Sequence, residues 1–141
     1  MLSDPGKKVI AMPAPFNVFK AGLAEDRVQF GLWLTLGTAY AAEVAATAGF
    51  DWLLIDGEHA PNDLLSINAQ ISALSSHDVS PIVRIPQTDP ALIKQVLDLG
   101  AQTLLCPMVN TADDARAIVA AMRYPPRGIR GVGYMLGRAS R

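Results

Sequence analysis

Four short runs of continuously hydrophobic residues recur along the chain, and a helical pattern follows each of them. The runs lie at residues 30–34, 52–55, 81–83 and 103–106. Short runs that are apolar throughout are typical of strands buried on both faces of a parallel sheet. The pattern therefore predicts four strands, each followed by a helix.

The first two predicted helices have recognisable ends. Residues 39–48 are rich in alanine and stop at Gly49, a residue type that favours the left-handed conformation after a helix. Asn62 or Asp63 can cap the second helix, because both side chains accept hydrogen bonds from a first helical turn. Its apolar residues recur at the spacing of one helix face: Leu64, Ile67, Ile71 and Leu74.

The third and fourth predicted helices have equally clear signals. Asp89 followed by Pro90 is a cap followed by a proline suited to the first helical position, and the helix closes before Gly100. Thr111 with Asp114 three residues later approximates a capping box for a helix over 112–122. The chain thus contains four strand–helix units.

Strands that alternate with helices every 20 to 28 residues or so predict an α/β fold with a parallel sheet and right-handed crossovers. Two architectures fit: an open doubly wound sheet, or the first four units of a (β/α)₈ barrel, which normally needs about 250 residues. The chain has 141 residues. Residues 1–15 carry three prolines and no periodicity, so we expect a flexible N-terminal extension before a folded domain over 16–141.

Composition narrows the class of protein. Half of the residues are hydrophobic, 18% are charged and the net charge is −1, values typical of a soluble globular domain. The sequence has no run long enough to span a membrane, and we expect a cytoplasmic protein. The single cysteine, Cys106, and only two histidines exclude an internal disulfide and a structural zinc site.

The net charge conceals an asymmetry. Five arginines and no acidic residue give 123–141 a charge of +5, which leaves −6 on the rest of the chain. An arginine-rich tail could contact an anionic ligand, a nucleic acid or an acidic neighbouring subunit, or could simply be solvated. Without interleaved aromatic residues, the tail is weak evidence for nucleic-acid binding, and we expect none.

Candidate chemistry lies where strands end, since parallel α/β folds bind ligands at the carboxyl ends of their strands. Asp56, Glu58 and His59 follow the second strand, and Arg84 ends the third. A histidine beside carboxylates suits general base catalysis, although a capping aspartate with an exposed histidine is an equal alternative. Arg84 predicts an anion site or an internal salt bridge, and Trp33 predicts a pocket wall or a core aromatic.

Several linked segments carry a resemblance to a known family. Residues 31–34, 50–61, 83–84 and 123–133 resemble, in order, the HpcH/HpaI aldolase family. The resemblance implies a (β/α)₈ barrel of the phosphoenolpyruvate/pyruvate type, assembled as homo-oligomers, usually hexamers. It also implies a divalent metal (Mg²⁺, Mn²⁺ or Co²⁺) and reversible cleavage of 4-hydroxy-2-oxo acids to pyruvate and an aldehyde through a metal-stabilised enolate.

The resemblance also assigns roles to individual residues. His59 matches the proton-accepting histidine, Arg84 the arginine that stabilises the enolate, and Trp33 a tryptophan of the substrate pocket. Asp98 matches an aspartate that raises the basicity of the histidine, whereas its sequence position alone suggests only a partner for Lys94. Asp56 is the alternative carboxylate for orienting His59.

The resemblance places the metal ligands of the family beyond Arg141, so we expect no metal ligands in this chain and little activity from the chain alone. A protein of a different class is the alternative: a non-catalytic half barrel that associates with itself or with an intact paralogue. Its basis is that the sequence stops before a fifth strand and that the tail is basic.

Overall fold

The computed structural model describes residues 15–133. Its strands are β1 (Gly31–Leu34), β2 (Trp52–Asp56), β3 (Ser80–Arg84) and β4 (Thr103–Leu105). Its helices are α1 (Val18–Ala24), α2 (Ala39–Ala46), α3 (Leu64–Leu74), α4 (Pro90–Asp98) and α5 (Ala112–Met122). The expected N-terminal extension falls almost wholly outside the described residues, as does the end of the basic tail. No helix within 15–133 is long and apolar enough to cross a membrane.

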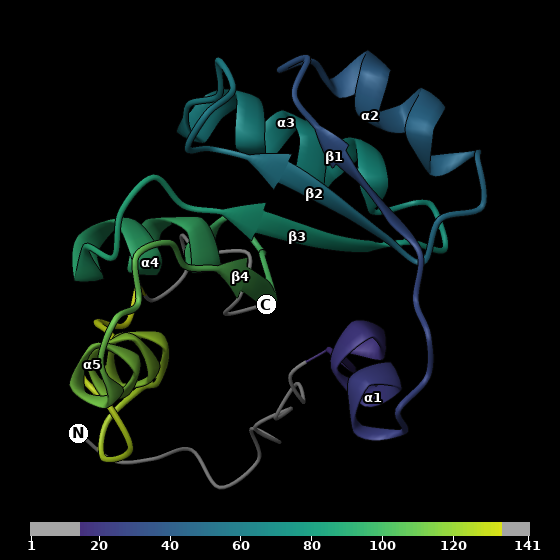
Figure 1. Cartoon of the computed structure of the whole chain (residues 1–141). Helices are drawn as coiled ribbons and strands as arrows, with labels where there is room; N and C mark the ends of the chain where they lie inside the picture. The colour runs from purple at the N-terminus through teal and green to yellow at the C-terminus, as the bar shows by residue number, and fades with distance from the viewer. Residues whose placement is uncertain (1–14, 134–141) are drawn as a thin grey trace, which may run out of the picture.

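The four strands form one parallel sheet whose spatial order is the same as their order in the chain. A doubly wound sheet reverses its strand order at a switch point, and this sheet has no such reversal. Helices α2 to α5 lie along one face of the sheet, which we call the outer face (Figure 1). Helix α1 lies on the opposite, inner side. This singly wound order is that of consecutive units of a barrel, and the prediction of four strand–helix units is confirmed.

Local signals place the starts of α3, α4 and α5 where the sequence predicts them, whereas α2 ends at Ala46, two residues before the predicted end. The side chain of Asp63, and not that of Asn62, caps α3 by accepting a hydrogen bond from the backbone N–H of Ser66 at 2.8 Å. Asp89 caps α4 ahead of Pro90, and Thr111 and Asp114 form the expected capping box of α5. Each cap satisfies backbone N–H groups that have no partner within the helix.

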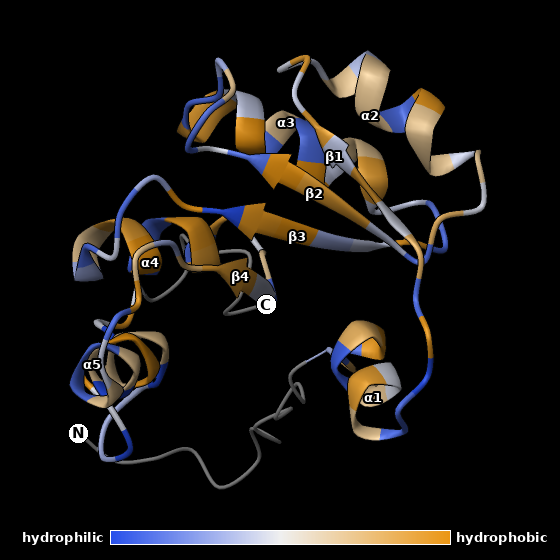
Figure 2. Ribbon diagram, viewed as in Figure 1, coloured by the Kyte–Doolittle hydropathy of each residue, from blue (hydrophilic) through white to orange (hydrophobic). Residues whose placement is uncertain are grey.

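The hydrophobic core lies between the outer face of the sheet and the helices. Leu53, Ile55 and Val83 alternate with inward-facing residues along β2 and β3, and all three are fully buried. They pack in one cluster with apolar residues of the covering helices, including Ile67 and Ile93. Figure 2 shows β2 and the second part of β3 as hydrophobic, with both strands turning hydrophilic at their carboxyl ends. The core therefore fixes the strands that carry polar groups at that end.

The inner face of the sheet is less evenly covered. Leu54 and Ile82, on the central strands, are 3% and 5% exposed, whereas Trp33 and Leu105, on the edge strands, are 43% and 40% exposed. The prediction that every strand is buried on both faces is therefore wrong for β1 and β4. The physical reason is that an edge strand has a neighbour on one side only, so its inward side chains lack half of their lateral cover.

Helix α1 is not predicted by the sequence, because its seven residues are too few to show a periodicity. Asn17 caps it, and the Asn17 side chain also donates to the Thr103 hydroxyl at 2.9 Å. Phe19 meets the ring of Trp52 edge-on, with ring centroids 6.4 Å apart. Because Trp52 and Thr103 begin their strands, α1 lies at the amino ends of the sheet, opposite the end where the polar residues gather.

Candidate active site

The last residues of β2 and β3, Asp56 and Arg84, are paired across the sheet. The Arg84 guanidinium donates from Nε to Oδ1 of Asp56 at 2.9 Å and from Nη2 to Oδ2 at 2.8 Å. This two-pronged geometry matches the planar fork of arginine to a carboxylate. The side chain of Asp56 is 3% exposed and that of Arg84 is 16% exposed, so the ion pair is shielded from solvent. Of the two alternatives for Arg84, the structure shows the internal salt bridge, and contact with a substrate anion stays a prediction.

Asp56 also organises the start of the loop after β2. Its Oδ1 accepts hydrogen bonds from the backbone N–H groups of Glu58 at 2.9 Å and of His59 at 3.1 Å. The hydrogen bond from Arg84, above all, and those from the two N–H groups lower the pKa of Asp56 to about 2, against the opposing effect of burial. Asp56 is therefore an ionised acceptor at neutral pH and not a proton donor.

Glu58 joins the two residues that carry the candidate chemistry. Its Oε2 lies 2.9 Å from Nη1 of Arg84 and 3.7 Å from Nε2 of His59. Sequence reasoning assigns no separate role to Glu58, because spacing alone does not show which neighbour a side chain meets across the sheet. The structure adds it to the site.

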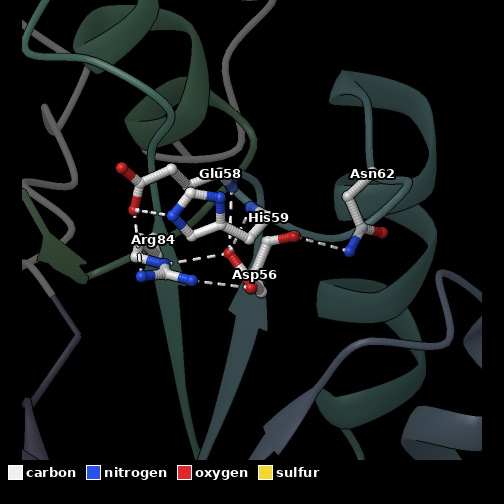
Figure 3. Close-up of polar contacts among 5 residues, drawn as sticks. All are labelled: Asp56, Glu58, His59, Asn62 and Arg84. Carbon is white, nitrogen blue, oxygen red and sulfur yellow. Dashed lines mark hydrogen bonds and ion pairs between the residues drawn. The ribbon is translucent and has the colours of Figure 1, made fainter. Parts of the chain in front are cut away.

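His59 projects from this cluster toward solvent. Its side chain is 71% exposed, and Glu58 is the charged partner close to its ring. Figure 3 shows the imidazole beside Glu58 and above the Arg84–Asp56 pair. An accessible imidazole next to a fixed guanidinium is able to reach a small molecule bound at the carboxyl ends of the strands.

Trp33 of β1 covers the other side of the arginine. The guanidinium carbon of Arg84 lies 4.4 Å from the centroid of the Trp33 ring, a cation–π distance. The ring also remains partly exposed, so Trp33 is a surface that holds Arg84 and not a buried core residue. Substrate contact by this ring remains a prediction.

Gly57 allows the loop after β2 to approach β3 closely. Its backbone N–H donates to the carbonyl of Arg84 at 2.8 Å. A Cβ atom at this position would lie 2.7 Å from that carbonyl oxygen, a distance that side chains do not tolerate. A glycine is therefore required for Glu58 and His59 to lie beside Arg84.

Asp98 is not brought to this cluster. It ends α4, which begins near the carboxyl end of β3 and leads to the amino end of β4, so Asp98 lies toward the opposite end of the sheet. Its Oδ1 accepts from Nη2 of Arg130 at 2.5 Å, and Arg130 in turn stacks on Tyr124. The pairing with Lys94 suggested by sequence position is replaced by this contact, and the role of Asp98 toward His59 remains a prediction without support from this geometry.

The described residues do not fit a metal site. Within 15–133 no group of three histidine, cysteine, aspartate or glutamate side chains is placed to hold a metal ion. Both carboxylate oxygens of Asp56 face Arg84, and Glu58 is paired with the same guanidinium. With a neutral His59, the cluster of two carboxylates and one guanidinium carries a net charge of −1.

Comparison with known proteins identifies the class. Four parallel strands in barrel order define a barrel-type α/β domain, and the sequence model of the HpcH/HpaI aldolase/citrate lyase family matches residues 29–137. The chain belongs to this family.

Relatives agree with that assignment. The hydroxypyruvate/pyruvate aldolase of Roseobacter denitrificans is 57% identical over 92% of this chain and 50% of its own length. The 4-hydroxy-2-oxo-heptane-1,7-dioate aldolase of Salmonella dublin is 59% identical over 89% of this chain and 48% of its own length. A crystal structure of a family member from Burkholderia cenocepacia superposes with a TM-score of 0.85 at 44% identity, over 89% of this chain and 51% of that one. The chain thus spans about half the length of these relatives.

Acid should weaken the fold through Asp56. Because its pKa is lower in the folded protein than in the unfolded chain, the ionised carboxylate stabilises the fold fully above about pH 4. This contribution, roughly 2 kcal/mol, is lost as the pH falls toward 2. Urea unfolding followed by circular dichroism between pH 5 and pH 2 measures it.

An Asp56→Asn variant should show a flatter pH dependence over this range and a lower stability at pH 5. Asp113→Asn is the matched control, because the side chain of Asp113 is 92% exposed. Equal pH dependence in Asp56→Asn and the unmodified chain would contradict the assignment.

Proposed function

We propose that the protein carrying this chain is a pyruvate aldolase that reversibly cleaves 4-hydroxy-2-oxo acids to pyruvate and an aldehyde. The observation that carries the proposal is the exposed imidazole of His59 beside a guanidinium that two carboxylates hold at the carboxyl ends of β2 and β3. The family membership and the aldolase names of the relatives support the same reaction class.

His59 is the proposed general base. In the cleavage direction, neutral His59 accepts the proton of the C4 hydroxyl while the C3–C4 bond breaks, and the bonding electrons move into the enolate of pyruvate. The imidazolium then returns the proton to the enolate carbon, which gives pyruvate and neutral His59. In the condensation direction, His59 removes a proton from the pyruvate methyl group, the enolate carbon adds to the aldehyde carbonyl, and the imidazolium protonates the resulting alkoxide. An imidazole suits both directions because it gains and loses a proton near neutral pH.

Arg84 is the proposed cation beside the developing charge. Two of its five N–H donors bind Asp56, and donors on Nη1 and Nη2 remain to face a substrate oxygen. A guanidinium that is already fixed in place stabilises new negative charge without first having to reorganise. Asp56, Glu58 and Trp33 hold Arg84 from three directions, and the Trp33 ring adds a wall for the substrate.

A divalent metal, Mg²⁺, Mn²⁺ or Co²⁺, is part of this proposal. The physical argument is that the cluster carries a net charge of −1, so pyruvate and its enolate are repelled unless a further positive charge is present. Because residues 15–133 do not form a ligand set, we place the metal ligands outside them. The metal would supply charge stabilisation to the substrate oxygens.

Replacing His59 should abolish proton exchange. We expect His59→Gln to slow the exchange of pyruvate methyl protons with D₂O by a factor of about 10² to 10⁴, the usual contribution of a general base. The measurement is proton NMR of pyruvate with the full-length protein and Mg²⁺. His77→Gln, which changes the only other histidine, should leave the rate unchanged. Equal rates for the two variants would refute His59 as the base.

Removing divalent metal should stop the same exchange. After treatment with EDTA and dialysis, we expect no exchange above background, and addition of Mg²⁺, Mn²⁺ or Co²⁺ should restore it. The free energy of unfolding of the 141-residue chain should change little, since its described residues form no set of metal-ligating side chains. Full exchange activity in metal-free protein would contradict the proposed metal requirement but not the proposed role of His59 as the base.

A second candidate function, self-association of the chain as a non-catalytic half barrel, has one observation in its favour. Beside the unpaired edge of β1 and along α2 runs an apolar groove of about 880 Å³. Four large hydrophobic side chains that line the groove are exposed to solvent: Leu32, Leu36, Tyr40 and Val44. The edge of β4 is likewise unpaired within the described sheet. In a dimer, the β1 edge of each copy could therefore pair with the β4 edge of the other copy.

Analytical ultracentrifugation of the 141-residue chain tests this candidate. Self-association through the β1–α2 groove predicts a dimer that dissociates in Tyr40→Glu but not in Leu65→Glu, where an equally exposed residue lies on α3. A monomeric chain, or a dimer equally sensitive to both substitutions, would exclude this mode of association.

A further inference from the structure

The position of the His59 imidazole depends on the backbone that carries it. Its side chain is 71% exposed, and the one ion-pair contact of its ring among the described residues is Glu58 at 3.7 Å, longer than a hydrogen bond. Packing therefore does little to hold the ring. Whatever fixes residues 57–61 also fixes the base.

The loop 57–61 is tied to Asp56 at both of its ends. At the start, the carboxylate of Asp56 accepts the N–H groups of Glu58 and His59. At the end, Nδ2 of Asn62 donates to the backbone carbonyl of Asp56 at 2.8 Å. Figure 3 shows Arg84 and Asn62 approaching Asp56 from opposite sides. The five-residue loop is thus closed on one residue at the end of β2.

Gln70 orients the amide of Asn62. Gln70 lies on α3, is 1% exposed and donates from Nε2 to Oδ1 of Asn62 at 2.7 Å. The hydroxyl of Ser66 donates to the same oxygen at 3.0 Å. With two donors on its oxygen, the amide presents its nitrogen to Asp56, and the other orientation would place two donors against each other. A buried polar side chain is costly unless it is bonded, and this one is bonded to the end of the loop.

From this chain of contacts we propose that Asn62 is a positioning residue for the catalytic base, oriented by Gln70 on α3. The inference rests on the proposed function, in which His59 moves the proton. Asn62 and Gln70 touch neither substrate nor the imidazole. They act by closing the loop, so that His59 stays within reach of a molecule bound beside Arg84.

The test uses Asn62→Asp. Aspartate keeps the acceptor for Gln70 and Ser66 but loses the donor to the Asp56 carbonyl, so the loop end is released while α3 keeps its contacts. Asn68→Asp is the matched control, because it makes the same change within α3, six residues after Asn62 and away from the loop end. Gln70→Met, close in size and without a donor, is the second variant and should give the same result in weaker form.

Two readouts separate positioning from general stability. In the full-length protein, we expect Asn62→Asp to lower the turnover number for pyruvate proton exchange by roughly tenfold to a hundredfold, with KM within about twofold, because Arg84 and its partners remain in place. In the same protein, the backbone amides of residues 57–60 should lose protection from hydrogen exchange; Pro61 has no amide proton. The imidazole resonance of His59 should shift, with His77 as the internal reference.

Three results would overturn the inference: unchanged loop protection in both variants, a released loop with unchanged turnover, or equal losses in Asn62→Asp and Asn68→Asp. If the unmodified protein exchanges no pyruvate protons, the proposed function fails and the catalytic role of Asn62 fails with it. The loop measurements would still decide whether Asn62 and Gln70 place His59.

Discussion

The ion pair between Asp56 and Arg84 is the interaction on which the rest of the site depends. It joins the last residues of two central strands, and both side chains are largely removed from water. Losing either partner would leave a poorly solvated charge, a defect that typically costs about 3 to 5 kcal/mol. The pair also sets the direction of the Arg84 fork and the turn that leads to His59. The stability of the fold and the proposed chemistry thus depend on the same two residues.

The cluster divides its tasks between held and accessible groups. Arg84 is held by two carboxylates and an indole ring, so its charge is fixed before any substrate arrives. His59 is held by its loop alone and remains open to solvent. The proposed enolate chemistry needs a cation fixed in advance and an accessible, positioned proton acceptor. The net negative charge of the cluster is the physical basis of the proposal that a further cation takes part.

The position of each strand in the four-stranded sheet explains how far its apolar side chains are exposed. Central strands β2 and β3 are covered on both faces, while β1 and β4 leave large apolar side chains such as Leu32 and Leu105 partly exposed. The alignments with the relatives cover 50% and 48% of the relatives' own length, so about half of each relative lies outside the aligned region. An edge of a parallel sheet with apolar neighbours favours contact with another strand and its helix.

The sequence alone determines the four strand–helix units. Its hydrophobic runs, capping residues and glycines are enough, because strand and helix patterns are local properties of the chain. The start of α5 at Ala112 follows from Thr111 and Asp114, and Pro125 and Pro126 require the helix to end before them. Position at a strand end also singles out Asp56, His59 and Arg84. Only the tertiary structure decides that Arg84 binds both carboxylate oxygens of Asp56 and that Glu58 contacts the same guanidinium. It also decides that Asn62 and Gln70 close the loop. Finally, it places Asp98 against Arg130 and not against His59. These contacts link residues on different strands and helices, and their partners are chosen by strand register and helix packing, which no local pattern encodes.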